Sequence, residues 1–452
     1  MQIITNIFRV AFANLITLIS SIVIALVLPL FLSIESYGEY RLFLFYAGYI
    51  GFLHFGFIDA MYLKYGGIDK NLVNQNLLRK EHNVFLIYQL SVSLLTLIIG
   101  ILIENYMMIL FAFLIIPSNL GSFHKLFYQA TGQFKKYSFI NIFYTFINLL
   151  LICMLLVFKF NNSFIYMVMM VVGHIIVLVI MEVDFFQYTK GAKSKGELNI
   201  IKYNKVGIFV LLGNLCVILI NSTGSWFVKL FLSIEDFAYY SFSISMMNMI
   251  LLLVNAVGLT FYNFIAKKEH KQKLILAKDF LLVIGVLASS AYFILEFVVN
   301  QILPQYKLAL NIIAISFLIF PYLIVINVII TNLYKGRKIE RIYFKVVLSF
   351  LLLGIVINII SFTKFKSMDS LAFANLITFI IWYFYSTYTA FEYLKSSLKE
   401  IVFLILHALI FLISVNLFNW YTGLITYFIS ISTLSVVFYW KSLNVFLTKL
   451  KR

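Results

Sequence analysis

Charged residues are scarce in this chain. Asp, Glu, Lys and Arg together make up 12% of the 452 residues, whereas hydrophobic residues make up 63%. A soluble globular chain is typically about half apolar and about a quarter charged. The composition, with a mean hydropathy of +0.99, excludes an ordinary soluble protein and predicts an all-α polytopic membrane protein. Apolar runs recur along the whole chain, so a cleaved signal peptide does not explain them.

Cysteine and the usual catalytic groupings are also scarce. Cys153 and Cys216 both lie in apolar stretches, which excludes a disulfide framework. The six histidines show no metal-ligand spacing. No acidic pair and no Ser/His/Asp set stands out in the sequence. We therefore predict no catalytic residue, no metal site and no cofactor, and the identity of any coupling ion stays open.

Acidic residues are half as frequent as basic ones, with 18 Asp and Glu against 35 Lys and Arg, for a net charge of +17. Such a charge is typical of nucleic-acid binding, but its placement argues against that partner. Twenty-eight of the 35 cations fall in alternate inter-helix segments and at the two chain ends, five fall on the opposite side, and two lie inside spans. This asymmetry follows the positive-inside rule and predicts that both termini are cytoplasmic.

Apolar windows of about 20 residues predict fourteen transmembrane helices. Six lie in the first half, at 10–32, 40–61, 84–103, 107–131, 137–158 and 163–181. The other eight lie at 205–231, 237–264, 276–299, 308–334, 342–361, 370–391, 401–418 and 421–440. We predict the following domains: a six-helix bundle over 1–185, a cytoplasmic linker over 186–204, a second six-helix bundle over 205–395, and two additional helices with a cytoplasmic tail over 396–452.

An internal repeat supports the division into two halves. The segment LFLSIE occurs at 30–35 and again at 230–235, and the GQFKKYSF segment from Gly132 is echoed by GRKIERIYF from Gly336 at a similar offset. The segment AFANLIT occurs at 11–17 and again at 372–378, at an unrelated offset, so short apolar segments also repeat by chance. Six helices per half is an even number, so the second half enters the membrane from the same side as the first. The sequence therefore predicts a parallel duplication, in which both halves have the same orientation.

Polar side chains form stripes within several predicted helices. Ser118, Ser122, Lys125 and Gln129 share one face of the fourth helix. The seventh helix has a similar stripe, formed by Asn214, Asn221, Ser222, Ser225 and Lys229. The eighth helix has another, formed by Ser241, Ser245, Asn248 and Asn255. A lysine near a helix end also reaches the interface by snorkelling, and small or amide side chains also join helices, so packing is the alternative to a ligand site.

The buried cations favour an anionic ligand. On the polar faces that carry Arg41, Lys125 and Lys229, cations outnumber acids, and both Lys and Arg bind phosphate. We therefore take as candidate substrate contacts Arg41, Lys125, Lys229, Gln129, Asn214, Asn221, Asn248 and Asn255.

Three segments resemble the polysaccharide flippases (Wzx-type O-antigen and capsule flippases) of the multidrug/oligosaccharidyl-lipid/polysaccharide exporter superfamily. They are the block 14–40 with Pro29 and a YGEY turn, FGFIDAMYLKYGG at 55–67, in which Lys64 stands where Arg is common, and QATGQFKKYSFINI at 129–142. The resemblance implies a V-shaped pair of bundles whose first, second, seventh and eighth helices line a central cavity. It also implies a flippase of the bacterial cytoplasmic membrane that moves undecaprenyl-diphosphate-linked oligosaccharide by alternating access.

The resemblance further implies lipid-linked oligosaccharide and membrane lipids as partners, together with a polysaccharide polymerase and chain-length machinery. Two alternatives stay open. A multidrug antiporter of the same superfamily would favour an acidic residue at mid-membrane, and none is secure in the first half. A membrane polymerase or glycosyltransferase would need a catalytic constellation, and polymerases usually carry a large outward loop, whereas the predicted outward loops have about ten residues or fewer.

Overall fold

The computed structural model describes residues 2–267, 270–337 and 339–450, without the side chains of 2–8, 10–11, 202, 206, 209–210, 252–267, 335, 340 and 445–450. Over these residues every regular element is a helix. Within the described residues, eleven helices are long and apolar enough to cross a membrane, or up to thirteen if each of two bent pairs forms one span. The predicted all-α polytopic membrane fold is confirmed. The count of fourteen stays a prediction, because part of the eighth predicted span lies outside the described side chains.

Contacts divide the chain into two compact units, Met1–Leu215 and Cys216–Arg452. The boundary falls within α8 (Ile200–Phe231), so this helix belongs to both units. The domain limits predicted from the sequence stay a prediction. Unit 1 contains α1 (Gln2–Phe31), α2 (Ile34–Ala47), η1 (Ile50–His54), α3 (Phe57–Tyr65), η2 (Lys70–Leu72), α4 (Gln75–Leu102), α5 (Tyr106–Ala130), α6 (Phe134–Val157) and α7 (Ser163–Tyr188).

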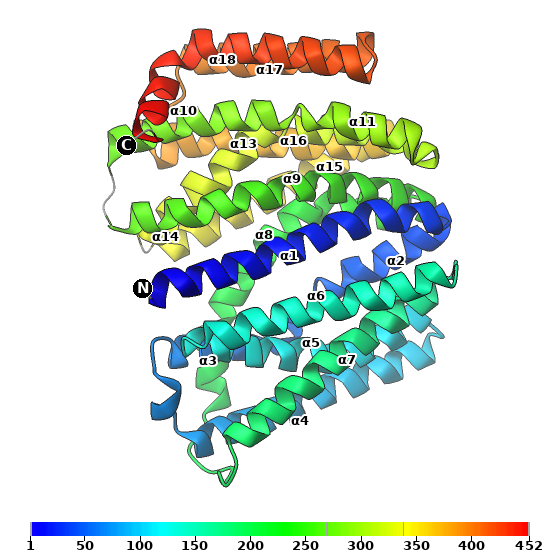
Figure 1. The fold of residues 1–452 in the computed structure, drawn as a ribbon, viewed down its shortest axis with the longest axis vertical. Helices are drawn as coiled ribbons and strands as arrows, with labels where there is room; N and C mark the ends of the chain where they lie inside the picture. Colours follow the sequence, from blue (N-terminus) through cyan, green and yellow to red (C-terminus); the bar gives the residue numbers. More distant parts are fainter. Residues whose placement is uncertain (1, 268–269, 338, 451–452) are drawn as a thin grey trace. The chain divides into compact units, whose positions relative to one another are not determined.

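Unit 2 is a second helical bundle, in which α17 and α18 form a hairpin that packs on α10 (Figure 1). Its long helices are α9 (Ile234–Lys267), α10 (Lys271–Ala288), α11 (Ala291–Gln301), α15 (Glu340–Phe365), α16 (Met368–Tyr385), α17 (Leu398–Leu417) and α18 (Trp420–Leu450). Its short helices are η3 (Pro304–Ala309), α12 (Leu310–Phe317), α13 (Phe320–Val325), η4 (Ile326–Ile330), α14 (Thr331–Gly336), η5 (Ser386–Ala390) and η6 (Glu392–Leu394).

The repeated LFLSIE segment builds the same structure in both units. In unit 1 it ends α1 and begins α2, and the Ser33 hydroxyl caps α2 by accepting the Ser36 N–H. In unit 2 it ends α8 and begins α9, where the Ser233 hydroxyl accepts the Asp236 N–H at 3.1 Å and the Asp236 carboxylate accepts the Ser233 N–H in return. A short polar cap between two apolar helices ends one span and starts the next.

Two predicted spans are bent. The span predicted at 40–61 is divided into α2, η1 and α3 with a bend of 62°, and the span predicted at 308–334 is bent by 49° before Phe320. Gly56 has a φ of +83°, which favours glycine, and a Cβ there would lie 2.5 Å from the Gly207 backbone of α8. At the second bend, Pro321 packs against Gly285 of α10, where a Cβ would lie 2.5 Å from the proline.

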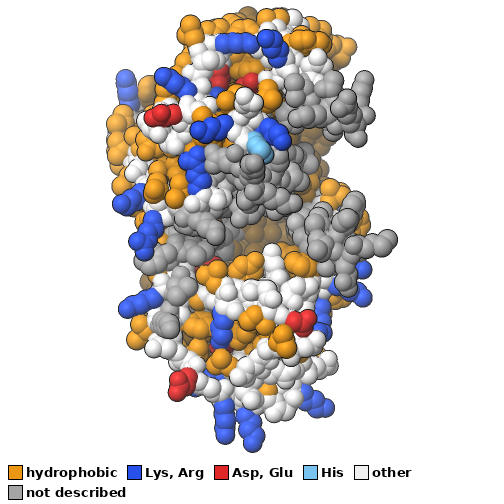
Figure 2. Space-filling view, turned by 90° about the vertical axis from the view of Figure 1, so that its left-hand side faces the viewer, with side chains coloured by type: hydrophobic (Ala, Val, Ile, Leu, Met, Phe, Trp, Pro, Cys, Tyr) orange, Lys and Arg blue, Asp and Glu red, His pale blue; other side chains and the backbone are white. Residues whose placement is uncertain are grey.

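The basic residues of unit 1 gather at one end of its helices. Loop contacts define this end: Arg79 Nη1 donates to the Thr189 carbonyl at 3.2 Å, and Lys80 Nζ donates to the Gly196 carbonyl at 2.5 Å. At the opposite end, the α1–α2 and α6–α7 connections are linked by a hydrogen bond. This end carries Glu35, Glu39, Glu104 and Lys159. Figure 2 looks toward these helix ends, and blue Lys and Arg side chains stand out among the side chains that it colours. We name this cation-rich end the basic end.

Candidate functional site

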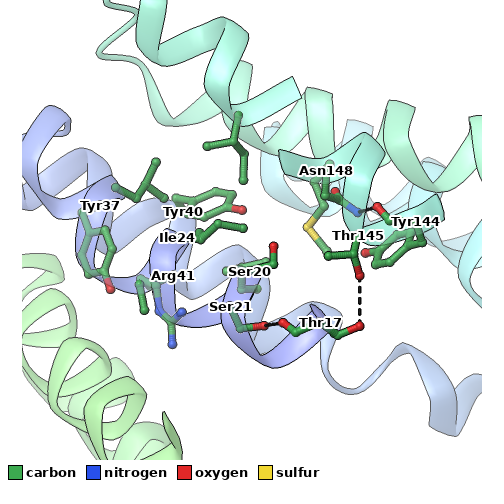
Figure 3. A pocket seen from close by; sticks show the side chains of 15 residues that line it. Thr17, Ser20, Ser21, Ile24, Tyr37, Tyr40, Arg41, Tyr144, Thr145 and Asn148 are labelled. Carbon is green, nitrogen blue, oxygen red and sulfur yellow. Dashed lines mark hydrogen bonds between the residues drawn. The ribbon is translucent and has the colours of Figure 1, made fainter. Parts of the chain in front are cut away.

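A polar pocket of about 260 Å³ lies inside unit 1, between α1, α2, α6 and α7 (Figure 3). Large aliphatic side chains, including Ile24, Leu28, Leu44, Ile152 and Met170, form part of its wall. The rest of the wall is polar and consists of Thr17, Ser20, Ser21, Tyr37, Tyr40, Arg41, Tyr144, Thr145 and Asn148. A pocket with apolar walls and a few converging polar groups is the usual form of a small-molecule or headgroup site.

Helical spacing brings the hydroxyl groups together. Thr17, Ser20 and Ser21 follow i, i+3 and i+4 positions on α1, so they share one face of that helix. The Thr17 hydroxyl lies 3.0 Å from that of Thr145 on α6, which fixes the two walls against each other. Asn148 follows one turn later on α6, and its amide donates to the Tyr144 carbonyl at 3.0 Å.

Arg41 is the cation of the pocket. It lies on α2, and its Cζ is 6.0 Å from the centre of the Tyr37 ring. Its Nε is buried and forms no hydrogen bond with the described residues. Among the described side chains, no carboxylate forms an ion pair with Arg41. A guanidinium in this setting has donors left over, and those donors match a phosphate or carboxylate oxygen.

Lys125 lies behind one wall of the same pocket. Its Nζ is 5.0 Å from the centre of the Tyr144 ring, and the Tyr144 hydroxyl lies 3.0 Å from Nε2 of His174 on α7. The Lys125 side chain is half-buried and does not line the pocket itself. The structure therefore places one predicted cation, Arg41, in the wall of this pocket, and another, Lys125, against the lining residue Tyr144.

The other predicted contacts lie elsewhere. Gln129 lines a separate open pocket of about 570 Å³ at the basic end, beside Asp69 and Thr131. Asn214, Asn221 and Asn248 are exposed, and the Asn221 amide donates to the Val217 carbonyl of its own helix at 2.9 Å. Lys229 is half-buried in the last turn of α8. Asn255 lies outside the residues whose side chains the structure describes.

Sequence reasoning missed most of the pocket wall. The signal was present in the i, i+3 and i+4 spacing of Thr17, Ser20 and Ser21 and in the Tyr144-Thr145 pair one turn before Asn148. A polar cluster of unit 2 was also missed, because its members come from different helices. There Asn375 Nδ2 donates to the Tyr240 hydroxyl at 3.1 Å, beside Gly224, where a Cβ would lie 2.0 Å from that hydroxyl oxygen.

The fold matches known structures over nearly the whole chain. The "Lipid II flippase MurJ, inward closed conformation" aligns with a TM-score of 0.59 and 14% identity, covering 99% of this chain and 100% of that one. The chain has the MurJ fold.

A second structure, named "protein A", aligns with a TM-score of 0.51 and 14% identity over 86% of this chain and 93% of that one. A "MATE in complex with Br-NRF" aligns over 86% and 94% with 10% identity, but its TM-score of 0.34 is too low to carry an argument. The sequence matches no protein-family model and no protein of curated function. Likeness to MurJ at 14% identity therefore shows the fold of this chain, and substrate and activity must be argued from its own residues.

Proposed function

We propose that this protein is a flippase that moves undecaprenyl-diphosphate-linked oligosaccharide from the cytoplasmic to the outer leaflet of a bacterial cytoplasmic membrane by alternating access. The observation that carries the proposal is Arg41, whose buried Nε has no described hydrogen-bond partner in a pocket rich in hydroxyl groups. The MurJ fold supports it, because the MurJ structure is named a lipid II flippase. On this proposal the basic end of unit 1 faces the cytoplasm.

The chemistry of the pocket suits a diphosphate next to a sugar. A guanidinium binds phosphate oxygens through two parallel hydrogen bonds, which fixes orientation as well as charge. The hydroxyl groups of Thr17, Ser20, Ser21 and Thr145 supply both donors and acceptors, as sugar hydroxyls require. The volume of about 260 Å³ holds part of a headgroup and not a whole oligosaccharide. We therefore assign to this pocket the contact with the diphosphate and its first sugar.

The test is translocation in proteoliposomes made with the purified full-length protein. They contain an undecaprenyl-diphosphate oligosaccharide whose exposure is followed with a membrane-impermeant glycosidase. Arg41→Gln removes at least one charge-assisted hydrogen bond worth about 1.5–3 kcal/mol, so we expect translocation to fall at least about 10- to 100-fold. Arg41→Lys keeps the charge and should keep more activity. Lys307→Gln, which removes a cation from an exposed turn of unit 2, is the matched control and should leave the rate unchanged.

Other outcomes would contradict the proposal. Translocation of drug cations without translocation of the glycolipid would indicate a multidrug exporter, and equal rates for wild type and Arg41→Gln would remove the pocket from the mechanism. A parallel arm with lipid II distinguishes between two diphosphate-linked substrates. Lys125→Ala and Lys229→Ala in the same assay test the two lysines. In cells we expect a polysaccharide polymerase and chain-length machinery to act on the product.

A further inference from the structure

Two histidines and a carboxylate meet near the basic end of unit 1. His82 lies on α4, His124 on α5 and Glu182 on α7, each roughly two turns from the end of its helix. The Nε2 atoms of both histidines lie 2.9 Å from the same oxygen, Glu182 Oε1. The three ligand atoms all lie within 4.8 Å of one another. Spacing along the sequence did not indicate this cluster, because each residue comes from a different helix.

Aromatic rings pack around the two histidines of the cluster. His82 and His124 are 0% and 1% exposed, and the Phe185 ring stacks on His82 at 4.5 Å between centres. Phe123 and Phe186 lie 5.9 Å and 5.7 Å from the His82 ring. The Glu182 side chain is 18% exposed, so solvent reaches the cluster on its side. A buried histidine pair costs free energy unless its polar atoms have partners.

Two polar atoms of the cluster have no partner. His124 Nδ1 and Glu182 Oε2 are buried without a hydrogen bond among the described residues. His82 Nδ1 lies 3.3 Å from the Asn83 side-chain oxygen and donates to it in the tautomer that carries its proton on Nδ1. In that tautomer, Nε2 of the neutral ring has no hydrogen and turns its lone pair toward Glu182 Oε1, which lies 2.9 Å away. A cation between these two atoms removes the repulsion.

The neighbouring acids already have cationic partners. Glu81 pairs with Lys64 and accepts hydrogen bonds from Tyr65 and Tyr203, and Asp184 pairs with Lys136 at 2.6 Å. Partial burial and the adjacent Glu81 carboxylate raise the pKa of the Tyr203 phenol far above its ordinary value, so it stays a donor. Glu182 has two histidines where its neighbours have a lysine.

We propose that His82, His124 and Glu182 bind one divalent transition-metal ion of the zinc class. Two imidazoles and one carboxylate are a common zinc ligand set, with a fourth position open to water. Tetrahedral bonds of about 2.0–2.2 Å place neighbouring ligand atoms about 3.3 Å apart. The two histidine–Glu182 separations are 2.9 Å and all three atoms lie within 4.8 Å, so small side-chain movements would bring them to that geometry. With the metal on Nε2, His82 Nδ1 would donate to the Asn83 oxygen, and this is the outer-shell hydrogen bond that metal-bound histidines usually make. The ion joins α4, α5 and α7 at the basic end.

The test uses Co²⁺ as a spectroscopic probe and Zn²⁺ as its competitor. The full-length protein is purified in detergent with a tag that contains no histidine, stripped with chelator and titrated. We expect one Co²⁺ per chain, with the visible bands of a tetrahedral site, and full displacement by Zn²⁺. Asn83→Leu removes only an outer-shell partner and should weaken Co²⁺ binding about 10- to 100-fold. Glu182→Gln and His124→Gln remove a metal ligand and should weaken Co²⁺ binding by more than that. His407→Gln, at a buried histidine of unit 2, should bind like the wild type.

A second measurement needs no variant. Adding Zn²⁺ back to stripped wild-type protein should raise its thermal midpoint in proportion to the logarithm of the free Zn²⁺ concentration. Failure of the wild type to bind Co²⁺ would overturn the proposal, as would equal binding by Glu182→Gln. A thermal midpoint that depends on pH and not on Zn²⁺ would show that a proton occupies the cluster, and would overturn it too.

Discussion

A buried ion pair in unit 2 allows a quantitative prediction. Lys278 on α10 donates to the Glu400 carboxylate of α17 at 2.6 Å and to the Leu394 carbonyl at 2.8 Å. The two side chains are 3% and 4% exposed. Glu400 also accepts hydrogen bonds from the Tyr383 hydroxyl and, at 2.7 Å, from the Ser396 hydroxyl. The pair therefore fastens the α17–α18 hairpin to the rest of unit 2.

Lys278→Met keeps most of the side-chain volume and removes the charge. It leaves the Glu400 carboxylate buried with two hydroxyl donors and no cation, and breaking such a pair costs about 3–5 kcal/mol. We expect a loss of that size in the free energy of unfolding, measured by denaturant titration in detergent micelles. Lys307→Met changes an exposed lysine of η3 in the same unit and should stay within about 0.5 kcal/mol of wild type.

The double variant separates charge from packing. In Lys278→Met/Glu400→Gln the amide still accepts from Tyr383 and Ser396, but no unpaired charge is buried. We expect it to be more stable than Lys278→Met alone, because the largest cost of the single change is the isolated carboxylate. A loss below about 1 kcal/mol for Lys278→Met, or a double variant no more stable than Lys278→Met alone, would refute the reasoning.

Three further predictions concern the contact between α8 and Gly56, the helix cap in the repeated segment, and the membrane topology. Gly207→Ala places a Cβ 1.8 Å from the Gly56 carbonyl and should destabilise by about 1–3 kcal/mol in the same titration, whereas Gly213→Ala on the same helix meets no atom within 4 Å and should be neutral or stabilising. Ser233→Ala removes a helix cap and should cost about 0.5–2 kcal/mol, and full stability would show that the cap is dispensable. In a chain without Cys153 and Cys216, an impermeant thiol reagent applied to intact cells should label a cysteine at Tyr421 and not at Lys193; the reverse would invert the predicted topology.

Composition and periodicity were sufficient for the fold class, because lipid imposes long apolar helices on any chain that crosses it. The repeat at 30–35 and 230–235 predicted equivalent positions, and the structure confirms them as the same capped helix junction. Hydropathy windows did not predict the bends. The bend before α3 depends on the backbone contact between Gly56 and Gly207, and the sequence alone does not reveal a contact between residues 151 positions apart.

The candidate site was predicted in part for a similar reason. Arg41 and Lys125 stood out because charge is rare in the spans, and the structure places both beside one polar pocket. The amide stripe of α8 was less informative. Asn214 and Asn221 are exposed, and Asn221 satisfies a carbonyl of its own helix, as polar side chains in membrane helices commonly do. Helical periodicity identifies a shared face, but only packing decides what that face meets.

Charge pairing inside the two units gives Arg41 its significance. Burying a charge in a membrane protein costs about 3 kcal/mol or more at a helix centre, so it persists where a partner offsets the cost. Glu81, Asp184 and Glu400 each have a lysine within ion-pair distance. Arg41 has no such partner among the described side chains, and its buried Nε is left without an acceptor. Lys125 likewise forms no ion pair among the described side chains, and its ammonium group lies over the Tyr144 ring of the same pocket. On the proposed function, the substrate supplies the anion that Arg41 lacks within the chain, and a diphosphate matches both the guanidinium and the hydroxyl groups around it.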